Sequence, residues 1–307
     1  MEAQVSYDAV AKERDGDLSS GTVPFRHFNN YVKKCLIQYC LDATREAEPR
    51  RTFAVLDLAS GRGGDLGKWL FMQSPPLGEK IATHDAVVKT NHYDGFDISP
   101  ESVQEARRRF ESFPNKTCTA TFTVADCFAE EFLVGTLPSQ PNFGRYSVVS
   151  IQFAIHYACK TTKQIDDLLL AVRNSLVSGG ILIATTVDPH ELSRRVRSDS
   201  LNSSLFQISL DQPPEWSTED GTLLKTGTSY HFRLQGFVDC TEYVVPLSYI
   251  TQQIGSLGFR EYTPMSASFN HFLEQYKKDR KKNKGLVLTS EEEELSTLYR
   301  TMCFVKE

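Results

Sequence analysis

One short segment combines an apolar run, three close glycines and two acids. Residues 53–69 read FAVLDLASGRGGDLGKW. The run Phe53–Leu58, which contains Asp57, predicts a buried parallel strand, and the residues from Asp65 onward predict the start of a helix. Glycines readily adopt positive φ angles, and they let a ligand approach the backbone closely. The segment is therefore typical of the first crossover in a nucleotide-binding α/β fold.

The spacing of the glycines limits which class of ligand the loop can bind. The loop reads G-x-G-G and is followed by Asp65, whereas dinucleotide folds carry G-x-G-x-x-G and P-loops need a Lys-Ser or Lys-Thr pair. A carboxylate at the start of the helix would repel a pyrophosphate and attract an amine or a sulfonium. We therefore expect S-adenosylmethionine, and the alternative is a glycine turn that serves only packing.

Two further acids follow the next strands. Asp97 ends a predicted strand over 93–97, and Asp126 follows one over 120–125. Ligands of open α/β sheets bind outside the carboxyl ends of the strands. We expect Asp97 to bind the ribose hydroxyls and Asp126 to lie near the adenine amino group. Either acid alone could be a cap, but acids at three successive strand ends favour a binding site.

The elements that must position these acids alternate as helices and strands, which predicts a Rossmann-like α/β fold with a mostly parallel sheet. Residues 74–92, with Pro75 and Pro76, are expected to form a loop insertion. Gly179 and Gly180 are expected to close a helix. The predicted helices cover 28–40, a segment starting at Ser99, and 165–176; further strands cover 146–153 and 181–187.

After residue 190 the pattern changes. Strands are predicted over 231–237, 241–245 and 298–306, and helices over 247–257 and 268–282. No long Gly/Ser linker interrupts the chain, so we expect one domain over 1–307, with a C-terminal antiparallel strand pair and an inserted substrate-binding region. Its parts would be a helical lead-in (1–52), a cofactor-binding core (53–189), and the substrate-binding insertion with the C-terminal strands (190–307).

Composition excludes several classes of protein. The chain has 307 residues, is 40% hydrophobic and carries a net charge of −5. Its length and hydrophobic content are sufficient for one large core or two modest ones. It shows neither a signal peptide nor a membrane-spanning run, so we expect a soluble intracellular protein. The cysteines are odd in number and form no C-x-x-C, which argues against a disulfide framework and against a zinc site. They are Cys35, Cys40, Cys118, Cys127, Cys159, Cys240 and Cys303.

The net negative charge argues against binding along nucleic acid irrespective of sequence. Basic residues do cluster, but most such runs are solvated helix faces, and the acidic run Glu291–Glu294 follows the last of them closely. Any contact with a polyanion should therefore be local and short. The basic runs are Arg26–Lys34, Arg107–Arg109, Arg194–Arg197 and Lys277–Lys284.

Two further segments carry the most specific signal. Phe28–Lys33 reads FNNYVK, and Ser150–Ala158 reads SIQFAIHYA. With the glycine loop, and in this order, they resemble the eukaryotic mRNA cap guanine-N7 methyltransferase family. The resemblance continues through Cys240–Tyr243 and Leu298-Tyr299, so it covers the chain from Val5 to the C-terminus.

The resemblance implies transfer of a methyl group from S-adenosylmethionine to N7 of the terminal guanosine of GpppN-capped mRNA, which yields S-adenosylhomocysteine. It implies neither a metal nor a general base. Implied partners are capped RNA and, further afield, other capping enzymes or the RNA polymerase II machinery; the protein would be nuclear and monomeric. The implied cofactor residues are Asn30, Gly61, Arg62, Asp65, Asp97, Asp126 and Gln152, with Asp57 supporting the loop. The implied cap residues are Phe28, Asn29, Phe153, His156, Tyr157, Glu242 and Tyr299.

The chemistry of guanine supports the second group. Aromatic faces hold a positively charged purine, and a carboxylate such as Glu242 can accept hydrogen bonds from N1 and N2. A donor aimed at N7 would block the reaction, so recognition must come from the opposite edge. Glu242, His156 and Tyr299 would position the base, while Lys33, Lys34 and Arg107–Arg109 are candidates for holding the triphosphate.

The chain departs from the family pattern in places. It has Ala59-Ser60-Gly61 where the family has Gly-Cys-Gly, and Arg62 where the family has Lys. A proline near the guanine is shifted, so we leave Asp188 and Pro189 out of the site. Whether the chain is an excised domain or part of a fusion with other capping activities stays open.

Three rival interpretations remain. A methyltransferase with another small-molecule or protein acceptor would share the loop and Asp97, but would not need Phe28, His156, Tyr157 and Glu242 together. A non-enzymatic relative would be expected to lose the glycine loop or Asp65, and both are intact. A nicotinamide-dependent dehydrogenase is disfavoured by the G-x-G-G-D spacing.

Overall fold

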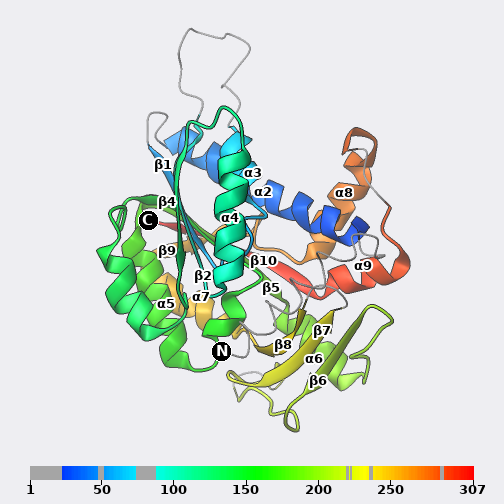
Figure 1. Ribbon diagram of the computed structural model, residues 1–307. Coiled ribbons are helices and arrows are strands. Elements are labelled where there is room, and N and C mark those ends of the chain that lie inside the picture. The colour runs from blue at the N-terminus through cyan, green and yellow to red at the C-terminus, as the bar shows by residue number, and fades with distance from the viewer. Residues whose placement is uncertain are drawn as a thin grey trace.

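The computed structural model describes residues 23–47, 52–73, 88–218, 221, 223–234, 238–283 and 287–307. At its centre, a seven-stranded sheet of these residues has the order β3-β2-β1-β4-β5-β10-β9 (Figure 1). Strands β1 to β5 run parallel, whereas β10 is antiparallel to both β5 and β9. The strands are β1 (Phe53–Leu58), β2 (Thr90–Asp97), β3 (Thr119–Val124), β4 (Tyr146–Gln152), β5 (Leu176–Val187), β9 (Phe259–Glu261) and β10 (Tyr299–Lys306).

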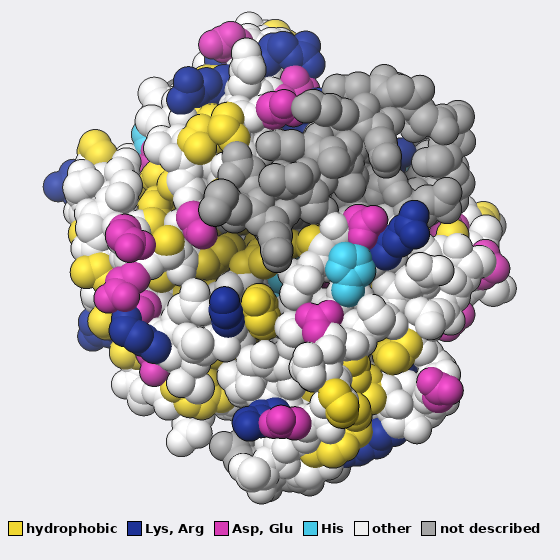
Figure 2. All heavy atoms as spheres, turned by 60° about the horizontal axis from the view of Figure 1, so that its bottom comes forward, with side chains coloured by type: hydrophobic (Ala, Val, Ile, Leu, Met, Phe, Trp, Pro, Cys, Tyr) yellow, Lys and Arg dark blue, Asp and Glu magenta, His cyan; other side chains and the backbone are white. Residues whose placement is uncertain are grey.

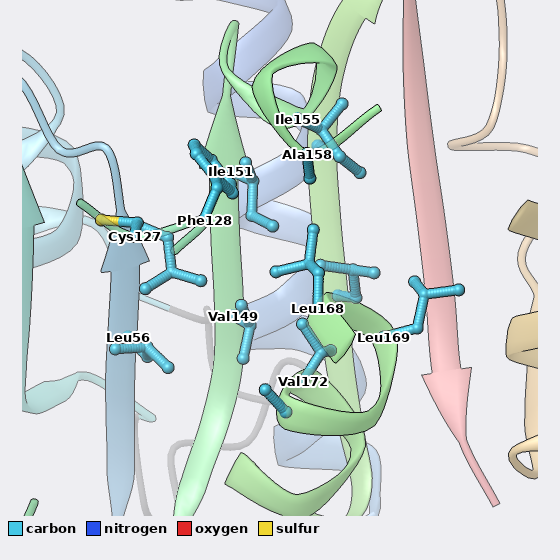
Figure 3. Close-up of a cluster of buried hydrophobic side chains, with 14 of the residues drawn as sticks. Leu56, Cys127, Phe128, Val149, Ile151, Ile155, Ala158, Leu168, Leu169 and Val172 are labelled. Carbon is cyan, nitrogen blue, oxygen red and sulfur yellow. The ribbon is translucent and has the colours of Figure 1, made fainter. Parts of the chain in front are cut away.

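One face of this sheet packs on α5 (Thr162–Ser175), α7 (Leu247–Ser256) and the short helical turns η1 (Glu131–Thr136), η2 (Leu137–Ser139) and η3 (Ile155–Ala158). Figure 3 shows Leu56 of β1 and Val149 of β4 beside Leu168 and Val172 of α5. These strand residues are buried because both faces of a parallel sheet are covered.

The opposite face packs on α2 (Val23–Ala47), α3 (Leu66–Phe71) and α4 (Pro100–Ser112). Leu36, Trp69 and Val103 come from these three helices and are buried with Val55 of β1. Helix α4 begins as its sequence predicts, because the Ser99 side chain accepts a hydrogen bond from the Ser102 amide and proline follows at the first helical position.

A second, antiparallel sheet contains β6 (Phe206–Leu210), β7 (Ser229–Leu234) and β8 (Val238–Tyr243). Helix α6 (Pro189–Arg197) precedes it, and α8 (Phe269–Asn283) and α9 (Ser290–Thr297) lie at the other end of the same lobe (Figure 1). A further core joins this sheet to α2, α8 and α9 through Phe28, Phe232, Leu273 and Leu295. The N-terminal turns of α2 are thereby fixed to the lobe, while its C-terminal turns pack on the main sheet.

The predicted fold class is confirmed, since the main sheet is mostly parallel, helices flank it, and β10 lies between β5 and β9 and is antiparallel to both. The chain after Pro189 is divided between the two sheets, because β9 and β10 return to the main one. Short elements that the sequence did not reveal are α6, β6, β9 and α9.

The expectation that Gly179 and Gly180 close a helix is wrong. Helix α5 ends at Ser175, and β5 begins at once with Leu176. Leu176 already pairs with Tyr146 of β4, and a register shift follows before the next pair. Gly179 has a φ of 72°, so the glycines accommodate an irregularity inside the strand rather than a helix terminus.

Other bounds differ by a few residues. Strand β4 ends at Gln152, because Phe153 has a φ of 55° and turns the chain out of the sheet. Strand β3 ends at Val124, so a residue separates it from Asp126. Of the expected insertion, residues 74–87 lie outside the described residues, and residues 90–92 belong to β2 rather than to a loop. Residues 1–22 and 48–51 of the lead-in and 235–237 of a predicted strand also lie outside the described residues.

Charges of both signs are interspersed over the face in Figure 2 rather than gathered into one basic field. Of the run Lys277–Lys284, the side chains from residue 280 onward lie outside the described residues. Lys277 pairs with Glu293 at 3.0 Å, so the acidic run does screen it.

All seven cysteines are free thiols. Among the described helices, none has the length and apolar character needed to cross a bilayer.

Candidate functional site

A cavity of about 1460 Å3 lies at the carboxyl ends of the parallel strands. It exceeds the 300–1,000 Å3 typical of a pocket for one small molecule, so two ligands could share it. One part is walled by the glycine loop and the acids after β1, β2 and β3; the other is walled by η3, β8 and the start of β10. Every residue expected to bind the cofactor or the cap lines this cavity, with the exception of Phe28.

The glycine loop is tied to the end of β2 by Asp97. The Gly61 amide donates to Oδ2 of Asp97 at 2.8 Å, and the Ser99 amide donates to Oδ1 at 2.9 Å. Gly61 and Gly63 have positive φ angles, and a Cβ on Gly63 would lie 2.5 Å from Leu66. The loop therefore favours glycine at positions 61 and 63, and Asp97 holds the loop as well as facing the cavity.

Asp65, at the start of α3, pairs with two lysines. Lys33 of α2 lies 2.8 Å from Oδ2 of Asp65, and Lys68 lies 2.5 Å from Oδ1. Burial alone would raise the pKa of Asp65, but these two ammonium groups outweigh it and lower that pKa. Lys68 also donates to Oδ1 of Asn30 at 2.8 Å. The cluster carries a net positive charge with both signs present, which suits a zwitterionic amino acid.

Asp57 lies beneath the loop and is nearly inaccessible to solvent. Burial raises the pKa of this carboxyl to about 7, although the Tyr93 hydroxyl donates to Oδ2 at 2.7 Å and stabilises the charged form. Tyr93 of β2 stands opposite Val55 of β1, and Asp57 follows Val55 by two residues on the same strand. The support that the sequence assigned to Asp57 thus takes the form of a buried Tyr–Asp hydrogen bond.

The remaining cofactor candidates are arranged differently. Asp126 accepts from the Phe128 amide at 3.1 Å, so it caps its own turn while lining the cavity. The Gln152 amide oxygen accepts from Thr185 at 3.2 Å, which fixes the side chain at the end of β4. Arg62 lines the cavity from within the glycine loop.

Glu242 and His156 face each other in the other part of the cavity. Both side chains are about 3% exposed, and Nε2 of His156 lies 3.6 Å from Oε1 of Glu242. Burial lowers the pKa of His156 to about 3 and raises the pKa of Glu242 to about 7. His156 is therefore neutral, and the two side chains do not form an ion pair.

Several buried polar atoms in this region have no hydrogen-bond partner among the described residues. They are both ring nitrogens of His156, the side-chain oxygen of Asn29 and the hydroxyl of Thr186. All three residues line the cavity. Because buried polar groups are normally hydrogen-bonded, these atoms are suited to receive the polar edge of a ligand.

Aromatic rings complete this wall. Phe153 packs edge-on against Tyr299 at 5.3 Å between ring centroids, and Tyr157 lies 4.2 Å from the His156 ring. Phe28 is fully buried instead, edge-on to Phe269 and Tyr276. Its predicted place on the cavity wall is thus corrected: Phe25, which is also buried, lines the cavity, and Phe28 lies in the core with it.

Sequence reasoning missed two residues that line the cavity and one that supports it from behind. Phe25 precedes Phe28 by about one helical turn, which could have been recognised from the helical period. Thr186 stands near the end of β5, where strand-end position was the available signal. Tyr230, which bonds Glu242, gave no signal because it lies twelve residues away on the neighbouring strand.

Basic side chains also line the cavity. Arg108 and Arg109 of α4 are there, each held by Glu105 at 2.8 Å. Lys160 and Arg26 line it from other elements. Lys33, a candidate for the triphosphate, is engaged with Asp65 instead. Within the described residues, no three His, Cys, Asp or Glu side chains gather in a way that could hold a metal ion.

The chain matches a known protein family over nearly its whole length. The mRNA (guanine-N(7))-methyltransferase domain matches residues 6–307. The mRNA cap guanine-N(7) methyltransferase of Drosophila melanogaster is 30% identical over 228 residues, which are 72% of this chain and 49% of the relative. That of Saccharomyces cerevisiae is 26% identical over 264 residues, 83% and 55% respectively. This chain therefore spans about half the length of these relatives.

Among solved structures, an S-adenosylmethionine-dependent methyltransferase from Clostridium acetobutylicum superposes with a TM-score of 0.51. The match covers 98% of both chains at 14% sequence identity. At this identity, the likeness shows the fold alone.

Proposed function

Because the chain belongs to the mRNA (guanine-N(7))-methyltransferase family, we propose that it methylates N7 of the terminal guanosine in GpppN-capped RNA. S-adenosylmethionine would be the methyl donor. The observation that carries the proposal is the buried carboxylate of Glu242, which lines the same cavity as the glycine loop. Among the described residues, Tyr230 alone donates a hydrogen bond to it, so acceptor positions remain for a ligand. Such an acceptor matches the N1 and N2 donors of guanine.

The cofactor fits the residues present. Asp65 with Lys33 and Lys68 offers both charges to an amino acid zwitterion, and Asp97 and Asp126 face the cavity where a ribose and an adenine would follow. When bound, S-adenosylmethionine supplies an electrophilic methyl group on a good leaving group. The proposal requires no metal, and it assigns none of the described residues to one.

The proposed work of the chain is to position the guanine. Glu242 would accept from N1 and N2, while Phe153, Tyr157 and Tyr299 would hold the faces and edges of the ring. N7 lies on the opposite edge and would point toward the cofactor part of the cavity. Holding two reactants in line accounts for large rate gains without proton transfer.

His156 has no role as a base in this scheme. Burial keeps its pKa near 3, so the neutral imidazole binds protons weakly at physiological pH. Guanine N7 already carries a lone pair and needs no deprotonation. As positive charge develops on the purine, N1–H becomes a stronger donor, so the contact to Glu242 should tighten in the transition state and contribute to kcat.

The wider assignments follow the family and belong to the same proposal. They are a single cap methyltransferase domain over 1–307, capped RNA as the macromolecular partner, a nuclear location and a monomeric state. Other capping enzymes or the RNA polymerase II machinery would be the proteins that deliver the RNA.

The test is methyl transfer from labelled S-adenosylmethionine to short RNAs that begin with GpppA, with ApppA or with an uncapped triphosphate. We expect label only in the first, at N7. Free small-molecule acceptors and a protein extract are run as competitors. Efficient methylation of uncapped RNA, or of another acceptor in place of GpppA-RNA, would contradict the proposal.

A further inference from the structure

Besides the Tyr93–Asp57 pair beneath the glycine loop, two further buried tyrosine–carboxylate pairs differ in how completely the carboxylate is hydrogen-bonded. In the main sheet, Tyr146 donates to Asp94 at 2.6 Å. Asp94 also accepts from Thr121 and Asn142 and lies 2.9 Å from His92. Neither Tyr146 nor Asp94 lines the cavity. This carboxylate is surrounded by donors, and its role is structural.

The second pair lies across β7 and β8, where Tyr230 stands directly opposite Glu242. The Tyr230 hydroxyl donates to Oε2 of Glu242 at 2.8 Å, and both side chains are almost inaccessible to solvent. Among the described residues, this hydroxyl is the one hydrogen-bond donor to Glu242. A carboxylate has about four acceptor positions, so those not used by Tyr230 are left for a ligand in the cavity that Glu242 lines.

We propose that Tyr230 is a positioning residue of the guanine subsite, whose hydroxyl holds the Glu242 carboxylate in the orientation that receives N1 and N2. The inference rests on the proposed function and deepens it. Tyr230 does not line the cavity and would touch neither substrate. It acts through Glu242, by restricting rotation of the carboxylate and by stabilising its charged form.

The surroundings of Glu242 make this second effect measurable. The titratable groups beside Glu242 are Tyr230, His156 and Cys240. Further out, Tyr157 contacts Cys240, and Tyr299 and Cys159 lie near Tyr230. Burial keeps His156 neutral and raises the pKa of Cys240 to about 12. Between pH 5 and 9, Glu242 is therefore the group of this set expected to change charge.

Removal of the hydroxyl has a defined consequence. Hydrogen bonding from Tyr230 lowers the pKa of Glu242 against the larger effect of burial, which raises it to about 7. Without the hydroxyl, the pKa should rise further. Less carboxylate is then present at neutral pH, and the pH at which guanine binding is lost on acidification moves upward.

The test measures binding of the dinucleotide GpppA, without S-adenosylmethionine, from about pH 5.5 to pH 9. Tyr230→Phe should weaken binding about tenfold at pH 7, the size of one hydrogen bond to a charged group. The loss should shrink as the pH rises and Glu242 ionises in both proteins. Tyr146→Phe removes a matched buried hydroxyl outside the cavity, so it should lower stability and leave binding and its pH profile unchanged.

A loss that is the same at every pH would show that the Tyr230 hydroxyl does not stabilise the charged form of Glu242, and it would overturn the proposal. Unchanged binding by Tyr230→Phe would overturn it too. Thermal unfolding checks that the variants fold. If Tyr230→Phe does not fold, the measurement is repeated with Tyr230→Met, which fills similar space without a hydroxyl.

A separate readout distinguishes this inference from the proposed function. The infrared band of the protonated Glu242 carboxyl is assigned by its loss in Glu242→Gln and followed against pH without ligand. In Tyr230→Phe its midpoint should move to higher pH, whether or not GpppA is the ligand. Failure of the parent to bind GpppA would refute the proposed function, and an unmoved midpoint would refute the role of Tyr230.

Discussion

The sharpest prediction concerns Glu242→Gln. The change keeps the size of the side chain but replaces one acceptor oxygen by an NH2 group. In the parent, Oε2 accepts from Tyr230 at 2.8 Å and Oε1 lies 3.6 Å from His156. If the amide oxygen keeps the bond to Tyr230, its NH2 group opposes the N1 and N2 donors of guanine. If the amide is flipped, the Tyr230 hydroxyl must turn to accept.

The size of the effect follows from burial. Glu242 is about 3% exposed, so water cannot replace a lost contact. Each hydrogen bond to a charged group contributes about 1.5–3 kcal/mol, and two such bonds from guanine would be disturbed. Burial raises the pKa of Glu242 to about 7, so part of the parent is protonated at pH 7, which reduces the difference slightly. We expect kcat/KM for GpppA-RNA to fall about a hundredfold or more.

The assay is methyl transfer to GpppA-RNA and to an inosine-capped RNA, which lacks the N2 amine, at several pH values. The inosine cap should be a poorer substrate for the parent and should be penalised less by the substitution. Parent activity should fall as the pH drops through about 7, because protonation removes the charged acceptor. The glutamine variant has no such group there, so its profile should be flat over that range.

S-adenosylmethionine binding serves as the control, because Glu242 lies in the other part of the cavity and the variant should bind the cofactor normally. Near-parental activity of Glu242→Gln on guanosine caps would refute the assignment of guanine recognition to this residue. The methyltransferase assignment would survive that result.

Three further predictions concern other parts of the chain. Asp97→Ala should weaken S-adenosylmethionine binding at least about tenfold by calorimetry, because the loop amide of Gly61 also loses its acceptor; unchanged affinity would leave Asp97 a capping residue. Neutralising three lysines of the run Lys277–Lys284 should raise KM for capped RNA at low salt and leave kcat unchanged, with the difference fading as salt rises; an unchanged KM would make the run a solvated helix face. Burial would raise the pKa of Asp94, but hydrogen bonds outweigh it and lower that pKa, so the free energy of unfolding should fall as the pH drops below about 4. Asp94→Asn should be less stable at pH 7 and lack that slope in denaturant titrations, and an equal slope would contradict the assignment.

Much of the fold could be predicted because its signals are local. The apolar run before the glycine loop, the Ser99 cap and the amphipathic period of α5 each depend on residues close in sequence. Parallel strands place their carboxyl ends at one edge of a sheet, so Asp97 and Asp126 could be assigned to one cavity before their distance was known.

Position along a helix or strand was harder to resolve. A glycine pair after a helical pattern predicts a helix terminus, yet Gly179 lies inside β5, because pairing with β4 continues past it. Phe28 and Phe25 are both aromatic residues of one helix, and only the packing of α8 decides that Phe28 is buried and Phe25 lines the cavity.

The sequence by itself determined the fold class, the glycine loop and the family, because each depends on residue types at short, ordered spacings. Only the tertiary structure decided which acids are bonded and which are available. Lys33 meets Asp65, and Tyr230 meets Glu242, across contacts between separate elements. Burial and hydrogen bonding act through space, so no spacing along the chain could show that Asp94 is surrounded by donors while Glu242 is left to receive a ligand.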